Sequence, residues 1–181
     1  ATPVAASVPT MWLLGSSDYS ARLAAERGLP YVFAHHFSGQ GTAEALALYR
    51  EGFRPSEVLD APRTFLTVNA AVAPTAEEAQ RLALPHLQMM LALRTGQPLS
   101  AQRLVEEAEE VGVPEQQQPL VEAMSRRWVI GDPETARARL AELAAEHGVD
   151  EVMVHPVASA YAGTDPAASP AREQTLRLLA S

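Results

Sequence analysis

One unit recurs along this chain and constrains its fold more than any other feature: a short apolar run, a turn, an Ala- and Leu-rich stretch and a glycine. The first copy has its apolar run at Thr10–Leu14, its amphipathic stretch at Ser17–Arg27 and its glycine at Gly28. The run suits a buried strand, and the stretch followed by glycine suits a helix with a left-handed C-cap. Strands that alternate with helices imply βαβ crossovers and a parallel sheet.

The next two copies repeat this order. The second pairs a strand at Tyr31–Phe33 with a helix over Gly41–Glu51, for which Thr42 is the expected N-cap. The third pairs a strand at Arg63–Val72 with a helix that begins at Thr75. Thr75 and Glu78 form the T-x-x-E pattern of a capping box, which predicts a helix start at this point.

The C-terminal part continues the alternation. Asp132-Pro133-Glu134 predicts a helix start, because proline suits the first helical position and acids suit the positive end of the helix dipole. That helix ends at Gly148, the last strand follows at Glu151–His155, and a terminal helix is expected at Ala171–Ala180. We expect four strands in all, each belonging to a βα unit.

Four βα units amount to half of a (βα)₈ barrel, which usually needs roughly 250 residues. A half barrel leaves two parallel edge strands unpaired. The chain is therefore expected to close against an N-terminal half, to form a dimer, or to be a small open α/β domain. We expect a single domain over residues 1–181, with a surface insertion near 97–127 and an irregular tail over 158–181.

Composition excludes several classes of function. The formal net charge of −8 argues against binding to nucleic acid. The chain has no cysteine and no lysine, so it offers no thiolate nucleophile or metal ligand, no Schiff-base lysine and no Walker-type phosphate lysine. No apolar run is long enough to span a membrane and no export signal opens the sequence, so a cytoplasmic location is expected.

The turn after the first apolar run has the chemistry of an anion site. Gly15 allows close backbone approach, Ser16, Ser17 and Ser20 offer hydroxyl donors, and a helix start adds free amides and a partial positive charge. A phosphate group suits this place, although Asp18 opposes an anion. In the alternative interpretation, Ser17 serves only as the N-cap of the helix.

Two adjacent histidines follow the second strand, at the end where barrel enzymes place functional residues. Neighbouring residues of a strand point to opposite faces, so His35 and His36 are not expected to share a metal ion. One of them is a candidate for the substrate side. His86 and His147 fall in predicted helices and are expected at the surface, and His155 is a weaker candidate. We expect no metal site, and no pair of carboxylates is identified as catalytic.

Several segments resemble the luciferase-like, flavin-dependent monooxygenases, and within them the type found in antibiotic-biosynthesis clusters. The most specific segments lie in the first third of the chain: Met11–Ser17, Tyr19–Ala21, Ala24–Pro30, Val32–Phe37, Leu48–Arg50 and Phe53–Ser56. Less specific segments follow: Ala73–Ala79, Ile130–Glu134 and Gly148–Val154. The resemblance covers the chain from Val8 to about His155.

The resemblance implies a (βα)₈ barrel in which this chain supplies strands five to eight. It implies reduced FMN, or in relatives the deazaflavin F420, and dioxygen that oxygenates a small organic substrate of secondary metabolism, with a separate flavin reductase. The flavin phosphate would contact Ser17 and Ser20, with Gly15 and Ser16 shaping the turn. The catalytic residues would lie in the first four strands. The alternatives are a non-catalytic flavin-binding or partner subunit, and an F420-dependent oxidoreductase.

Overall fold

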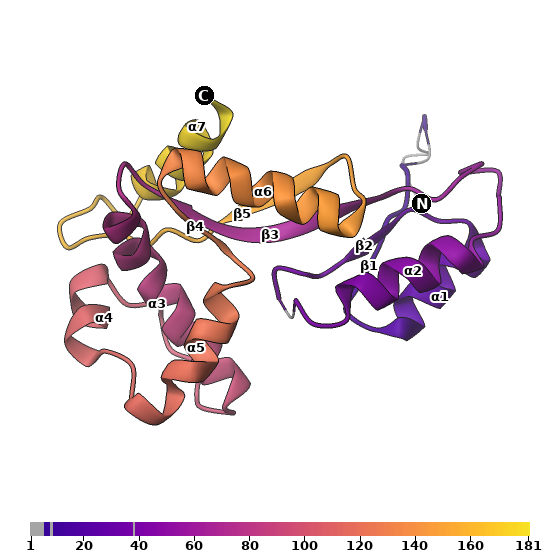
Figure 1. The fold of residues 1–181 in the computed structure, drawn as a ribbon. Helices are drawn as coiled ribbons and strands as arrows, with labels where there is room; N and C mark the ends of the chain where they lie inside the picture. Colours follow the sequence, from indigo (N-terminus) through magenta and orange to yellow (C-terminus); the bar gives the residue numbers. More distant parts are fainter. Residues whose placement is uncertain (1–5, 8, 38) are drawn as a thin grey trace. The chain divides into compact units, whose positions relative to one another are not determined.

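A computed structural model describes residues 6–7, 9–37 and 39–181 (Figure 1). The chain forms two compact units: the first comprises Ala1–Thr67 with His147–Val152, and the second comprises Val68–Glu146 with Met153–Ser181. The strands β3 (Thr64–Val72) and β5 (Val152–Pro156) each begin in the first unit and end in the second. The single domain expected over 1–181 stays a prediction.

The first unit is built from two βα pairs and the start of β3. Its elements are β1 (Leu13–Gly15), α1 (Asp18–Arg27), β2 (Tyr31–Phe33) and α2 (Thr42–Gly52). β1 pairs in parallel with β2, and β2 pairs in parallel with β3. Helices α1 and α2 lie side by side (Figure 1), because the buried face of α1 carries only small residues at Ala21, Ala24 and Ala25. The predicted strand–helix order is therefore confirmed here.

The helix ends of the first unit are set by two glycines with positive φ. Gly28 is the predicted left-handed cap of α1, with φ of 59°. The start of α2 differs from the prediction: Gly41, with φ of 76°, is its N-cap, and Thr42 is the first helical residue. Thr42 is not available for capping, because its hydroxyl lies 2.8 Å from Nδ1 of the buried His35.

The second unit carries a strand that the sequence analysis missed. β4 (Val129–Gly131) pairs in parallel with residues Ala70–Val72 of β3. The prediction of four strands was therefore too low, since the described residues contain five. A run of three residues is too short to show strand periodicity. It becomes a strand because the nine-residue β3 has backbone groups at its far end to pair with.

Helices account for most of the second unit. They are α3 (Ala76–Arg94), α4 (Val105–Val111), the short η1 (Glu115–Gln117), α5 (Gln118–Ser125), α6 (Pro133–His147) and α7 (Pro170–Ala180). The insertion predicted near 97–127 thus contains α4, η1 and α5. It packs on α3 through the buried side chains of Val105 and Met124, which share a core cluster with Leu82 and Leu87.

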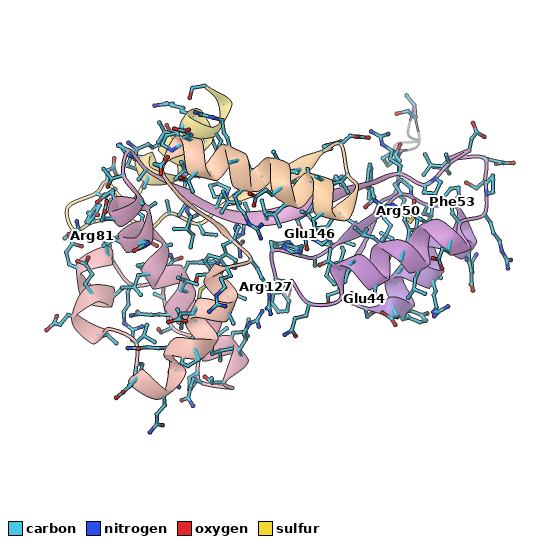
Figure 2. The ribbon with its side chains drawn as sticks, in the orientation of Figure 1. Glu44, Arg50, Phe53, Arg81, Arg127 and Glu146 are labelled. Carbon is cyan, nitrogen blue, oxygen red and sulfur yellow. The ribbon has the colours of Figure 1, made fainter. Side chains whose placement is uncertain are left out.

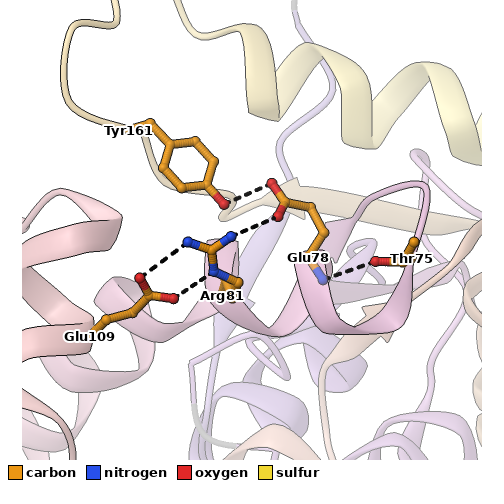
Figure 3. Close-up of polar contacts among 5 residues, drawn as sticks. All are labelled: Thr75, Glu78, Arg81, Glu109 and Tyr161. Atoms are coloured by element: carbon orange, nitrogen blue, oxygen red, sulfur yellow. Dashed lines mark hydrogen bonds and ion pairs between the residues drawn. The ribbon is translucent and has the colours of Figure 1, made fainter.

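The start of α3 shows the predicted cap in part. Thr75 accepts a hydrogen bond from the Glu78 amide at 3.2 Å, as the T-x-x-E pattern predicts. The Glu78 carboxylate instead accepts from the Tyr161 hydroxyl at 2.7 Å and pairs with Arg81 at 3.5 Å (Figure 3). Arg81 also pairs with Glu109 at 2.6 Å, which ties α3 to α4.

In the tail, residues 158–169 form no helix or strand, as expected for an irregular segment, and α7 follows them. Its first residues are nevertheless buried, since Ala158 and Ser159 are at most 4 % exposed. Tyr161 is held by Glu78, and α7 packs through Thr175, whose hydroxyl accepts from the Val72 amide at 3.1 Å. The terminal helix predicted at Ala171–Ala180 is confirmed within one residue.

The two capping glycines provide a test of this packing. A Cβ at Gly28 would overlap the Arg54 carbonyl and the Ser56 side chain, whereas at Gly41 no described atom lies within 4 Å of it. Both substitutions to alanine place a Cβ in the left-handed region. We expect Gly41→Ala to cost about 1 kcal/mol and Gly28→Ala about 3 kcal/mol, measured by urea unfolding. If both variants lose the same free energy of unfolding, the contacts around Gly28 do not contribute to stability.

Candidate functional site

The turn between β1 and α1 is held by its glycine. The Gly15 carbonyl accepts from the Ala34 amide at 2.9 Å, which fixes the end of β1 beside β2. A Cβ at Gly15 would overlap the Ser20 side chain, so only glycine lets α1 begin this close to the strand. Ser16 and Ser17, between these elements, are exposed.

Ser17 occupies the N-cap position of α1, but its side chain does not make the hydrogen bond to the first helical turn that usually caps a helix. Its backbone is extended, with φ of −140° and ψ of 158°, but its side chain makes no cap hydrogen bond with the described residues. Two other helix starts differ: Thr75 caps α3, and Asp132, before α6, accepts from the Glu134 and Thr135 amides at 3.0 and 3.1 Å. The first-turn amides of α1 and the Ser17 hydroxyl therefore remain accessible for an external acceptor.

Ser20 has a different environment from Ser16 and Ser17. It is 8 % exposed, and its hydroxyl donates to the Ser17 carbonyl at 2.6 Å. It also lies 3.2 Å from the Tyr31 hydroxyl, whose pKa is raised by burial, although the Ser20 contact opposes that shift. The single hydroxyl hydrogen of Ser20 is thus already used, so in this conformation Ser20 shapes the turn.

The two adjacent histidines have separate surroundings in the first unit. His35 is 5 % exposed, contacts Thr42 through Nδ1 and meets the His147 ring edge to face at 5.4 Å. His36 is partly exposed, and its Nδ1 lies 2.7 Å from the Thr67 hydroxyl. Both residues lie in the turn that follows β2, so the alternation of a strand does not apply to them, and their separate contacts leave the expectation of opposite faces a prediction.

His147 is buried, which corrects the expectation that it lies at the surface. It is 6 % exposed, and its carbonyl accepts at 2.8 Å from Arg50 of α2; Figure 2 labels Arg50 on this helix. Arg50 also donates to the Gly148 carbonyl at 2.7 Å. Its guanidinium thus satisfies the C-terminal carbonyls of α6, where a positive charge is favourable.

His86 is also buried, again contrary to the surface position expected for it. It is 8 % exposed, lies 5.3 Å from the Trp128 ring and 5.8 Å from the His155 ring, and has no hydrogen-bond partner for Nδ1 among the described residues. His155 Nδ1 lies 2.8 Å from the Asn69 side-chain oxygen. The second unit therefore contains an aromatic and polar cluster of Asn69, His86, Trp128 and His155.

Burial is the main reason why His86 stays neutral. It lowers the pKa of His86 to about 4, and the positive charges of His155 and Arg172 act in the same direction, while a hydrogen bond with Gln102 opposes them. Partial burial also lowers the pKa of His155, and Arg172 adds to this shift. Both rings can thus accept or donate hydrogen bonds as neutral imidazoles near pH 7.

Sequence reasoning missed the members of this cluster other than His155. A signal was present in β3, where the polar residues Thr67 and Asn69 occupy alternate positions within the mostly apolar run Phe65–Val72. Both are 1 % exposed, and each meets a histidine. Buried polar side chains at alternate strand positions require partners, which makes them markers of a functional or structural polar site.

The described residues contain no cluster of metal ligands and no helix able to span a membrane. No three His, Asp or Glu side chains among them are placed to hold a metal ion. Among the same residues, no helix combines the length and apolar character needed to cross a bilayer.

The lowered pKa of His86 predicts a loss of stability in acid. The unfolded chain takes up a proton on this residue near pH 6.5, whereas the folded chain does so only near pH 4. We therefore expect the free energy of unfolding to fall from about pH 6.5 to about pH 4, with up to about 3 kcal/mol from His86. His86→Gln should remove this part, as measured by urea unfolding at several pH values. Parallel pH profiles for both proteins would contradict this assignment.

Comparisons with known proteins agree with this fold. The protein YvbT of Bacillus subtilis is 42 % identical over 145 residues, which are 80 % of this chain and 43 % of YvbT. A luciferase-like monooxygenase of Escherichia coli strain K12 is 34 % identical over 80 % of this chain and 43 % of its own. The chain thus spans less than half the length of these relatives.

Solved structures show the same α/β arrangement. The apo-MsnO8 crystal structure matches with a TM-score of 0.80 and 29 % identity, over 99 % of this chain and 52 % of that one. The oxygenating constituent of 3,6-diketocamphane monooxygenase from Pseudomonas putida, in complex with FMN, matches in fold with a TM-score of 0.59 and 21 % identity, over 94 % of this chain and 47 % of that one. The family model for luciferase-like monooxygenases covers residues 1–151. The chain belongs to the luciferase-like monooxygenase family.

Proposed function

We propose that this chain is the C-terminal half of a flavin-dependent monooxygenase and contributes part of the flavin-phosphate site. The observation that carries the proposal is the exposed start of α1, where Ser17 stands at the N-cap but makes no cap hydrogen bond with the described residues. Such a helix start offers amide donors, a hydroxyl donor and a partial positive charge, which match the needs of a phosphate group.

The residues of the turn take different parts in this proposal. Ser16 and Ser17 would donate to phosphate oxygens together with the first amides of α1, whereas Gly15 and Ser20 would hold the turn in shape. Bound FMN, once reduced, would supply the electrons that activate dioxygen for transfer of one oxygen atom to a small organic substrate. The chain's own contribution is to bind and orient the cofactor.

Membership in the family supports FMN as the cofactor, since one structural relative is described in complex with FMN. F420 is the alternative cofactor. The reductase that supplies reduced flavin and a substrate from secondary metabolism are further parts of the proposal. Flavin binding without any turnover would instead identify a flavin-holding partner subunit.

The chain would supply strands five to eight of the barrel, and among the described strands β1 and β5 each pair with one other strand and carry an exposed apolar side chain. β1 pairs only with β2 among the described strands, and its Leu14 is 60 % exposed. In β5, Met153 is 50 % exposed. Strands that leave one edge without a partner favour pairing with further strands. An N-terminal half or a second subunit would supply them, in keeping with the 43 % to 52 % of the relatives' length that the chain spans.

The contrast between two helix caps allows a test of the phosphate assignment. Because the Ser17 hydroxyl makes no cap bond, Ser17→Ala should leave stability unchanged and weaken FMN binding about fivefold, through the loss of roughly 1 kcal/mol. Thr75→Ala removes a real cap and should do the reverse, lowering stability by about 1 kcal/mol with FMN affinity unchanged. Calorimetric titration of the chain assembled with an N-terminal half, together with urea unfolding, measures both quantities.

The outcomes of this comparison are distinct. If Ser17→Ala lowers stability but leaves FMN affinity unchanged, Ser17 is only a helix cap. Equal FMN affinity in both variants and the unchanged protein would remove the turn from the cofactor site.

The exposed β1 edge provides a second test, directed at assembly. We expect the chain to bind the N-terminal half of a family member, and Leu14→Arg to weaken that complex at least about tenfold, since a charge would enter an apolar interface. Leu176→Arg changes another exposed leucine, on α7, and should have no effect. Sedimentation velocity of the mixed halves measures the complex. Normal assembly of Leu14→Arg would place the interface elsewhere.

A further inference from the structure

A pocket in the second unit lies where β5 has ended and α7 begins. Its volume is about 210 Å³, which suits a small molecule or one group of a larger one. The lining comes from the segment before α4, the segment after β5 and the start of α7. It consists of Gln102, Arg103, Leu104, Ala158, Ser159, Ala160, Ala168, Ser169, Pro170, Ala171 and Arg172.

The ionisable side chains that line this pocket are all positively charged. Arg103 and Arg172 are its only ionisable lining residues, so no carboxylate faces them from the walls. Neither arginine forms an ion pair within the part of the chain that the structure describes. A chain with a net charge of −8 thus keeps two arginines in one pocket without acidic partners.

The arginines have only weak contacts with the protein itself. Arg172 donates from Nε to the Ala158 carbonyl at 3.4 Å, and Arg103 donates to the Gln88 side chain at 3.5 Å. Both distances are at the long end of the hydrogen-bond range, and each guanidinium has five N–H donors. Most of this donor capacity remains for a ligand.

Neutral polar groups complete the wall. Ser159 is 4 % exposed, and its hydroxyl accepts from the Gln102 amide at 2.6 Å. Ser169, the N-cap of α7, makes no side-chain cap bond within the described ranges, so the helix start adds further donors. This helix start supports the site but does not define it, because the arginines carry the charge.

We infer that this pocket binds the anionic group of a small molecule, a carboxylate or a phosphate. Guanidinium groups bind both through paired N–H donors. A cation is excluded by the two positive charges, and a macromolecular ligand is not needed to fill about 210 Å³. The inference concerns the second unit alone and does not depend on flavin binding at the turn.

The pocket is also connected to the buried cluster of histidines. Gln102, which donates to Ser159, is hydrogen-bonded to His86, and the charge of Arg172 acts on both His86 and His155. An anion beside Arg172 would partly cancel that charge. The ring resonances of both histidines should therefore report occupancy of the pocket.

Titration of the 181-residue chain, without flavin, with inorganic phosphate and, separately, with succinate tests the site. Calorimetry gives the affinity, and NMR spectra of the histidine rings give the location. We expect Arg172→Gln and Arg103→Gln each to weaken binding about tenfold, because each removes a charged hydrogen-bond donor. Arg177→Gln is the matched control on α7, since Arg177 pairs with Glu173, and it should keep the affinity within about twofold.

The results separate the two sources of the anion. Tighter binding of phosphate indicates a phosphorylated ligand, and tighter binding of succinate indicates a carboxylate; either supports the site. Circular dichroism checks that each variant is folded. If Arg172→Gln does not fold, Arg103→Gln still tests the site, because Arg103 is also exposed. Absence of binding by both anions, or equal weakening by Arg177→Gln, would overturn the inference. If phosphate or succinate binds as expected but the chain does not bind FMN in the separate titration, only the proposed flavin site is rejected.

Discussion

Much of this structure depends on the hydrogen bonds along β3. Its residues from Leu66 to Val72 are fully or almost fully buried, so their backbone groups must find partners within the protein. β2 pairs with its first residues and β4 with its last ones, while β5 pairs with it as well. These requirements explain why a three-residue run such as Val129–Gly131 becomes a strand at all.

The starts of the helices show how similar sequence signals lead to different structures. Thr75 and Asp132 accept hydrogen bonds from the first turns of α3 and α6, as helix caps do. Ser17 has the same position and a suitable backbone, yet its side chain makes no such bond with the described residues. Gly15 and Ser20 pack closely at this turn, so that a Cβ on residue 15 would overlap the Ser20 side chain. An uncapped, exposed helix start is the feature that separates the proposed phosphate site from an ordinary cap.

Buried polar groups provide a second organising feature. Thr67 and Asn69 interrupt the apolar pattern of β3, and each contacts a histidine from another segment. In the second unit, the histidines are kept neutral by burial and by the positive charge of Arg172. The neighbouring pocket is lined by arginines and by no carboxylate. An anion bound there would change the electrostatic potential at these histidines.

The sequence by itself determined the strand–helix alternation, the cap at Gly28, the helix starts at Thr75 and Pro133 and the turn at Gly15–Ser17. These features depend on residues close together in the chain, through periodicity, backbone freedom and capping chemistry. The family was also recognisable, because its motifs are local. Only the tertiary structure decided that His86 and His147 are buried, that Thr42 bonds to His35, that Ser20 is used internally and that β4 forms. Each of these results depends on partners distant in sequence, and no pattern within one segment specifies which distant group will lie against it.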